Sequence, residues 1–161
     1  MERRGRDKLI EELAQSAFDL ARAVKHETEQ RFHGEKQLTL SRLMALRLLA
    51  KTGPQKVRDV AGFLGVSDAA ASKTIETLVE RKLVQRVKSQ SDRRTRELSL
   101  TSVGRRLLSE YEIARRRVLA ESFREYSPED LHRASEMLDR VSWSIANRGA
   151  AASSPLGRGG Q

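Results

Sequence analysis

The segment VRDVAGFLGVSDAAASKTIETLVERKLV, residues 57–84, constrains the possible folds more than any other part of the chain. Its apolar residues recur at helical spacing over two turns and then stop at Gly65, which suits the positive φ of a tight turn. Ser67 is a favourable N-cap, and a second apolar stripe at helical spacing follows it. We therefore predict a helix-turn-helix, with an ordinary helical hairpin in a bundle as the alternative.

A β-hairpin is predicted directly after the second of these helices. The segment LVQRV, residues 83–87, places Leu83, Gln85 and Val87 on one side of a strand. The segment RELSL, residues 96–100, is its predicted partner because it alternates in the same way. The tip of the hairpin lies between them, and a hairpin that follows a helix-turn-helix makes a winged helix.

The rest of the chain is predicted to be helical. Proline occurs only at expected boundaries, and Thr101 and Ser127 are expected N-caps. Amphipathic patterns predict helices over residues 7–32, 39–52, 102–125 and 128–147. A small, polar, Gly-rich tail follows and is expected to be disordered. The predicted fold class is therefore mainly α with a small β-wing.

The positive charge of the chain is concentrated around the predicted hairpin. Residues 81–96 contain seven Lys and Arg side chains against Asp92 alone, so this segment carries +6 of the net +9. A localised positive field of this kind favours a polyanionic partner. A solvated loop without a partner is the alternative.

Several other functions find no support in the sequence. It contains no cysteine, which excludes disulfides, thiol chemistry and cysteine-ligated zinc. The sequence shows neither a phosphate-binding loop nor a nucleophile paired with a base, so nothing in it indicates an enzyme. His26 and His33 share a helix face near Glu29, but no third ligand is placed by the sequence, so we predict no metal and no cofactor.

No apolar run approaches the roughly 18 residues of a membrane span, and the N-terminal region has no apolar signal core. We therefore expect a cytoplasmic protein without a membrane partner.

The motif Asp92-x-Arg94, followed by LSLTSVG, resembles the wing signature of the MarR family of bacterial transcription regulators. The matching positions are Asp92, Arg94, Leu100, Thr101 and Gly104, and the resemblance covers roughly residues 7–146. It implies a homodimer that binds double-stranded DNA, with terminal helices that form a dimerisation region. The expected domains are residues 1–37 (N-terminal dimerisation helix), 38–101 (winged helix-turn-helix), 102–146 (C-terminal dimerisation helices) and 147–161 (tail).

A recognition helix reads bases with short side chains near its N-terminus. We therefore expect Ser67, Ala69, Ser72 and Lys73 at the bases and Thr77 at a phosphate. The resemblance places Arg94 in the minor groove, with Asp92 as its brace. The expected phosphate contacts of the wing are Arg86, Lys88, Arg93 and Arg96.

The resemblance also implies a site for a small anionic or aromatic effector between the dimerisation and DNA-binding regions. Its expected lining is Leu20, Val24, Met44, Leu48, Leu107 and Tyr111; the alternative is that these residues are simply core. The leading function is a repressor that an effector releases from an inverted-repeat operator. An architectural protein that coats DNA without an effector is the alternative.

Overall fold

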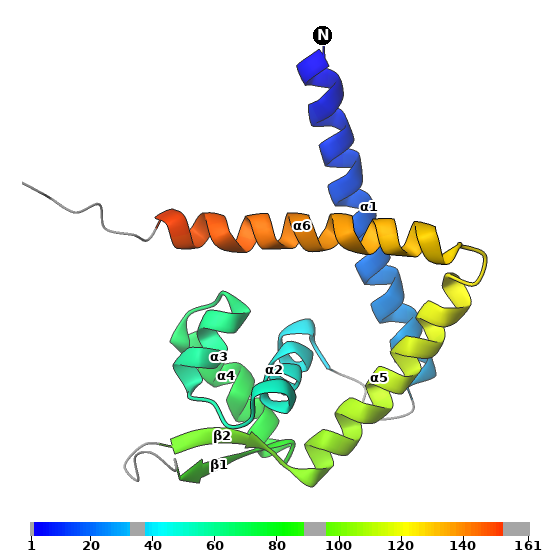
Figure 1. Cartoon of the computed structure of the whole chain (residues 1–161). Coiled ribbons are helices and arrows are strands. Elements are labelled where there is room, and N and C mark those ends of the chain that lie inside the picture. Colours follow the sequence, from blue (N-terminus) through cyan, green and yellow to red (C-terminus); the bar gives the residue numbers. More distant parts are fainter. Residues whose placement is uncertain (1, 33–37, 89–95, 153–161) are drawn as a thin grey trace, which may run out of the picture. The chain divides into compact units, whose positions relative to one another are not determined.

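The structure is a computed structural model that describes residues 2–32, 38–88 and 96–152 of the 161-residue chain (Figure 1). Its elements follow the predicted order of two helices, a helix-turn-helix, a two-stranded wing and two more helices. Their bounds are α1 Glu2–Arg31, α2 Leu40–Thr52, α3 Val57–Leu64, α4 Asp68–Glu80, β1 Val84–Lys88, β2 Arg96–Leu100, α5 Ser102–Ser122 and α6 Pro128–Ala152. The predicted fold class, mainly α with a small β-wing, is confirmed.

The chain forms two compact units, Met1–Ala120 and Glu121–Gln161. The first unit contains α1 to β2 and nearly all of α5, and it holds the buried core. Leu46 of α2, Ile75 and Leu78 of α4, and Leu98 and Leu100 of β2 are all at most 1% exposed. The helices and the wing therefore share one hydrophobic centre, which fixes the position of α4 relative to the hairpin.

Local capping residues explain the helix-turn-helix. Gly65 adopts the left-handed conformation with φ +65°, and its N–H donates to the carbonyls of Ala61 and Gly62 at the end of α3. Ser67 has extended backbone angles, and its side chain accepts a hydrogen bond from the N–H of Ala70. The chain thus turns over three residues and starts α4 with a satisfied N-terminus, as predicted.

The two strands pair antiparallel, with Val84 opposite Leu100 and Lys88 opposite Arg96. Gln55, just before α3, adds an isolated bridge on the other edge of β2 by exchanging two backbone hydrogen bonds with Leu98. The base of the wing is therefore anchored on both sides of β2, which the sequence did not reveal because only one residue forms the extra bridge.

The junction between the wing and α5 is held by Thr101. Its hydroxyl lies 2.6 Å from the carbonyl oxygen of Lys82, to which it donates, and it accepts from the N–H of Gly104 at 3.0 Å. A Cβ atom at Gly104 would lie 2.1 Å from the carbonyl oxygen of Leu83. Only glycine lets α5 approach the start of the wing this closely, so the Thr-x-x-Gly spacing is a packing requirement as well as a cap.

Several predicted boundaries were wrong by a few residues. The first helix begins at Glu2 rather than near residue 7, α5 ends at Ser122 rather than near 125, and β1 begins at Val84 rather than Leu83. The last helix continues to Ala152, so the start of the expected disordered tail is helical. Favourable small residues extend α6, and Gly149 does not stop it because one glycine costs only about 1 kcal/mol in a helix. Residues 153–161 lie outside the described part.

Candidate nucleic-acid interface and adjoining pocket

The outward face of α4 carries mostly short side chains near its N-terminus. Ala71, Ile75 and Leu78 are buried, whereas Ala69 and Lys73 are exposed and Ser72 is half-buried. Ser67 is exposed and already serves as the N-cap, but its hydroxyl can still donate. This face could approach a base edge closely, because only Lys73 extends far from the helix over its first two turns.

Two further side chains of α4 limit the expected interface with DNA. Thr77 is half-buried, and its hydroxyl donates to the carbonyl of Lys73 in its own helix at 3.2 Å. Glu76 is exposed beyond the turn that carries Lys73, and sequence reasoning did not consider it. A carboxylate there would repel a nearby phosphate, so the C-terminal half of the helix suits contact with DNA less well than the turn that carries Lys73.

Three basic side chains of the wing lie on one face of the hairpin. Side chains at alternate positions share a face, so Arg86 and Lys88 of β1 and Arg96 of β2 point to the same side. All three are exposed. That same face is buried at the base of the wing by Val84, Leu98 and Leu100, so the face changes from apolar to cationic toward the tip. The residues predicted at the tip, Asp92, Arg93 and Arg94, fall outside the described residues.

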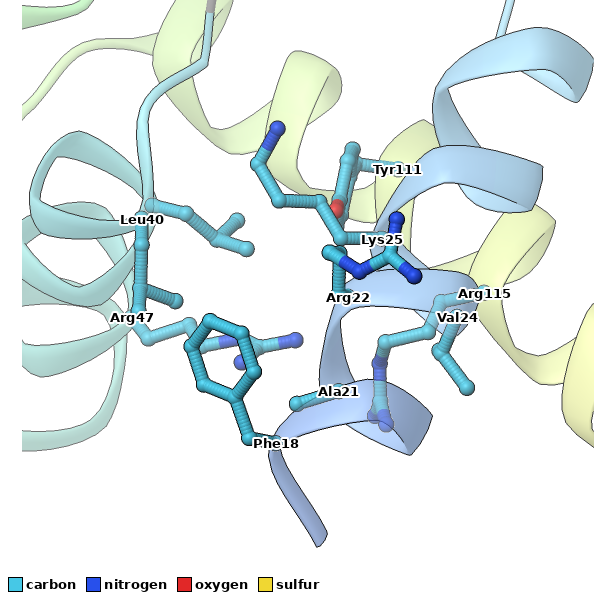
Figure 2. A pocket seen from close by; sticks show the side chains of 10 residues that line it. Phe18, Ala21, Arg22, Val24, Lys25, Leu40, Arg47, Tyr111 and Arg115 are labelled. Carbon is cyan, nitrogen blue, oxygen red and sulfur yellow. The ribbon is translucent and has the colours of Figure 1, made fainter. Parts of the chain in front are cut away.

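An apolar pocket of about 370 Å³ opens on the first unit, between α1, α2 and α5 (Figure 2). Its apolar lining includes Tyr111, which is 3% exposed, and Leu43. The labelled side chains approach from three sides in Figure 2, with the Tyr111 ring behind Lys25. The complete lining is Phe18, Ala21, Arg22, Val24 and Lys25 from α1, Leu40, Leu43 and Arg47 from α2, and Tyr111 and Arg115 from α5.

Only some of the residues that were expected to line an effector site lie in this pocket. Val24 and Tyr111 line this pocket, whereas Leu48 packs against the core and Leu107 is buried within it. Leu20 is 48% exposed on α1, and Met44 is half-buried outside the pocket lining. The four cations of the pocket were not recognised from sequence, because helical spacing identifies apolar stripes but not which charges meet across helices.

Glu112 of α5 joins two of these cations. Its Oε1 accepts from Nε of Arg47 at 2.5 Å, and its Oε2 accepts from Nε of Arg115 at 2.9 Å. Nη2 of Arg47 also lies 2.5 Å from Oε1, in an ion-pair contact that is not a hydrogen bond. This buried N–H group therefore has no hydrogen-bond acceptor among the described residues. The bridge links α2, which packs on α3 and α4, to α5.

The ionisation of the two α5 side chains follows from this setting. Burial raises the pKa of the Glu112 carboxyl, but hydrogen bonds from Arg115 and Arg47 outweigh it, so the pKa lies below its usual 4.5. Burial, together with the nearby carboxylate of Glu29, raises the pKa of the Tyr111 phenol above 10.0. Near neutral pH the carboxyl is therefore charged and the phenol is neutral.

No cluster of three metal-ligating side chains occurs within the described residues. His26 is exposed on α1, and His33 lies outside those residues. None of the described helices combines the length and apolar character that crossing a membrane requires.

A helix-turn-helix with a cationic wing defines the class of protein: a winged helix-turn-helix protein. The chain matches the model of the MarR family over residues 38–95. It is also 26% identical over 107 residues to the uncharacterized HTH-type transcriptional regulator YpoP of Bacillus subtilis (strain 168), covering 66% of this chain and 76% of that protein. These findings support a DNA-binding transcriptional regulator, and neither name refers to catalysis.

Solved structures show the same fold. A MarR family protein from Bacillus stearothermophilus has a TM-score of 0.72 at 18% identity, covering 87% of this chain and 97% of that one. Streptococcus pneumoniae FabT, solved in complex with DNA, has a TM-score of 0.73 at 19% identity, with the same two coverages of 87% and 97%.

Proposed function

We propose that the chain is a homodimeric repressor that binds an inverted-repeat operator and is released by a small effector. The observation that carries the DNA-binding part is the alignment of Arg86, Lys88 and Arg96 on one exposed face of the wing that follows α4. Three aligned cations suit a row of phosphates, which supply affinity and salt dependence without sequence information.

Specificity would come from the start of α4 and from the tip of the wing. Ser67, Ala69, Ser72 and Lys73 would meet base edges in the major groove, and Thr77 would meet a phosphate. Arg94 would enter the minor groove with Asp92 as its brace, and Arg93 would add a phosphate contact. FabT, which has the same fold, was solved in complex with DNA, and this supports DNA binding by the chain.

The proposal of a dimer is supported by apolar side chains that α6 leaves exposed. Leu131, Leu138 and Ile145 recur every seven residues, with Val141 between the last two, and they are 38–67% exposed. A seven-residue apolar repeat suits packing against another helix. The first helix also exposes Leu9, Ile10 and Leu13. A second copy of the chain would bury these stripes, and its two-fold axis would match an inverted repeat with half-sites about 10 bp apart.

The proposed effector site is the pocket between α1, α2 and α5. The pocket is apolar, and α2 packs directly on α3 and α4. A ligand there would therefore touch the helix that supports the helix-turn-helix. Because its task is to bind DNA, we place the protein in the cytoplasm.

The test is selection of binding sites from random DNA, followed by titration at physiological salt. A repressor should prefer the selected inverted repeat over random DNA by ~10³-fold or more. An architectural protein, the alternative, would show little preference. Absence of an enriched inverted repeat would rule out the proposed operator recognition.

A further inference from the structure

We propose that Glu112 acts as an internal competitor in the pocket, holding Arg47 and Arg115 until an amphipathic monoanion takes its place. The proposal rests on the proposed effector function and adds the residue that controls binding of the ligand. Glu112 is a positioning residue in this scheme, since it acts through the two guanidinium groups and does not itself line the pocket.

The charges around the pocket support a single negative charge on the ligand. The lining contains four cations and no carboxylate. Arg22 pairs with Asp19 at 3.5 Å and Lys25 with Glu29 at 2.6 Å, each within α1. Arg47 and Arg115 share one carboxylate. The four cations thus face three acids, and the surplus positive charge lies where two helices meet.

The bridge offers donors that an anion could use in place of Glu112. The side chains of Arg47, Arg115 and Glu112 are 36%, 35% and 18% exposed, so the site is partly withdrawn from water. Arg47 keeps one buried N–H group without an acceptor among the described residues. A carboxylate or sulfonate that displaces Glu112 could accept from that donor and take over the bonds that Glu112 now accepts. The apolar walls would hold the ligand's hydrocarbon or aromatic body.

The exchange would also reach the DNA-binding elements. Arg47 is the only α2 residue in the bridge, and α2 packs on α3 and α4. A ligand that separates Arg47 from Glu112 removes the ion pair that ties α2 to α5. At this point only apolar packing would then hold the helix-turn-helix to α5. The free and ligand-bound states would therefore differ in their contacts, and a ligand needs such a difference in order to shift the equilibrium between them.

The experiment uses two fluorescent probes with similar bodies: 1-anilinonaphthalene-8-sulfonate, a monoanion, and N-phenyl-1-naphthylamine, its uncharged analogue. In Glu112→Gln the carboxylate no longer competes for the guanidinium groups. We expect this variant to bind the sulfonate roughly tenfold more tightly than the wild-type chain. A tenfold change in affinity corresponds to about one hydrogen bond with a charged group. Affinity for the uncharged probe should change less than twofold.

Glu29→Gln is the matched control, because it removes the same charge from the partner of another lining cation. It should tighten sulfonate binding much less. Equal tightening in both variants would mean a general field effect and would overturn the proposal, as would unchanged or weaker binding in Glu112→Gln. Ala21→Trp, which fills the pocket, should abolish the difference between wild-type and Glu112→Gln backgrounds; a persisting difference would place the probe elsewhere.

Arg47→Gln provides an independent test if Glu112→Gln does not fold. It should weaken binding of the sulfonate and spare the uncharged probe, and equal binding of the sulfonate would contradict the proposal. Operator binding by the wild-type chain is measured without probe. Its failure would defeat the proposed function while leaving the probe result intact, so the two failures are distinguishable.

Discussion

Lys88 and Arg96 lie directly opposite each other in the last described pair of the β-hairpin, on its cationic face. Like charges in this position destabilise a two-stranded sheet by a few tenths of a kcal/mol or more. A hairpin selected for stability alone would place an acid at one of the two sites. The repulsion is relieved when both side chains contact phosphate, so the pair is better explained by a polyanion than by the fold.

Replacing Arg96 with Gln should therefore have opposite effects on folding and on binding. The free energy of unfolding should stay the same or rise slightly, because the repulsion with Lys88 is removed. Affinity should fall for all DNA sequences, and the slope of log K against log salt should become shallower by ~0.9 for the lost phosphate contact. Chemical denaturation and salt-dependent titrations measure the two effects. A less stable variant with unchanged salt dependence would show that Arg96 serves the fold.

Loss of Arg94 should reduce affinity for the operator in particular, whereas loss of Arg96 should reduce affinity for all DNA. Arg94→Ala is expected to cost ~1–3 kcal/mol of binding to the selected operator, because the proposed contact lies in the minor groove. Binding to random DNA should change less, and the dimer should persist in sedimentation. Unchanged operator affinity would remove Arg94 from the interface.

Gly104 should tolerate no side chain. In Gly104→Ala the new methyl group would meet the carbonyl oxygen of Leu83, and relief would require a shift of α5 away from the wing. We expect a loss of ~1–3 kcal/mol in unfolding free energy, as for an overpacked core site. Gly62→Ala is the control, since a Cβ at this helical position meets nothing within 4 Å. It should stabilise α3 by up to ~1 kcal/mol. Equal stability of the two variants by thermal melting would contradict the contact.

The features that could be predicted from sequence are those that depend on neighbouring residues in the chain. Gly65 and Ser67 act on neighbouring backbone, so the turn and the start of α4 followed from sequence. Thr101 was predicted as a cap, but its bond to Lys82 depends on how the wing folds back. The Arg47–Glu112 bridge joins residues 65 apart, and nothing in either helical pattern indicates that they meet. Tertiary packing therefore created the pocket's charges, whereas local chemistry determined the DNA-binding motif.

The bridge should make stability depend on pH. The folded-state pKa of Glu112 is below its usual 4.5, so the bridge stabilises the folded chain above that pH and loses this contribution as pH falls through the folded value. Glu112→Gln should be less stable than wild type by about 1 kcal/mol near neutral pH. The gap should close below the folded pKa, where wild-type Glu112 is also uncharged. Denaturation at a series of pH values below 7 measures it, and a gap that does not narrow as the pH falls would mean that shape rather than charge matters.

The exposed repeat on α6 should decide the oligomeric state. Truncation after Tyr126 removes that helix and should leave a monomer in sedimentation. Because truncation also removes a whole element, Leu138→Glu is the sharper variant: it places a charge in the middle of the apolar repeat and should weaken a helix-packed dimer. Arg140→Glu changes charge by more but lies off the repeat, so it should remain dimeric. If Leu138→Glu stays dimeric while the truncated chain is monomeric, the dimer contacts use another face of α6.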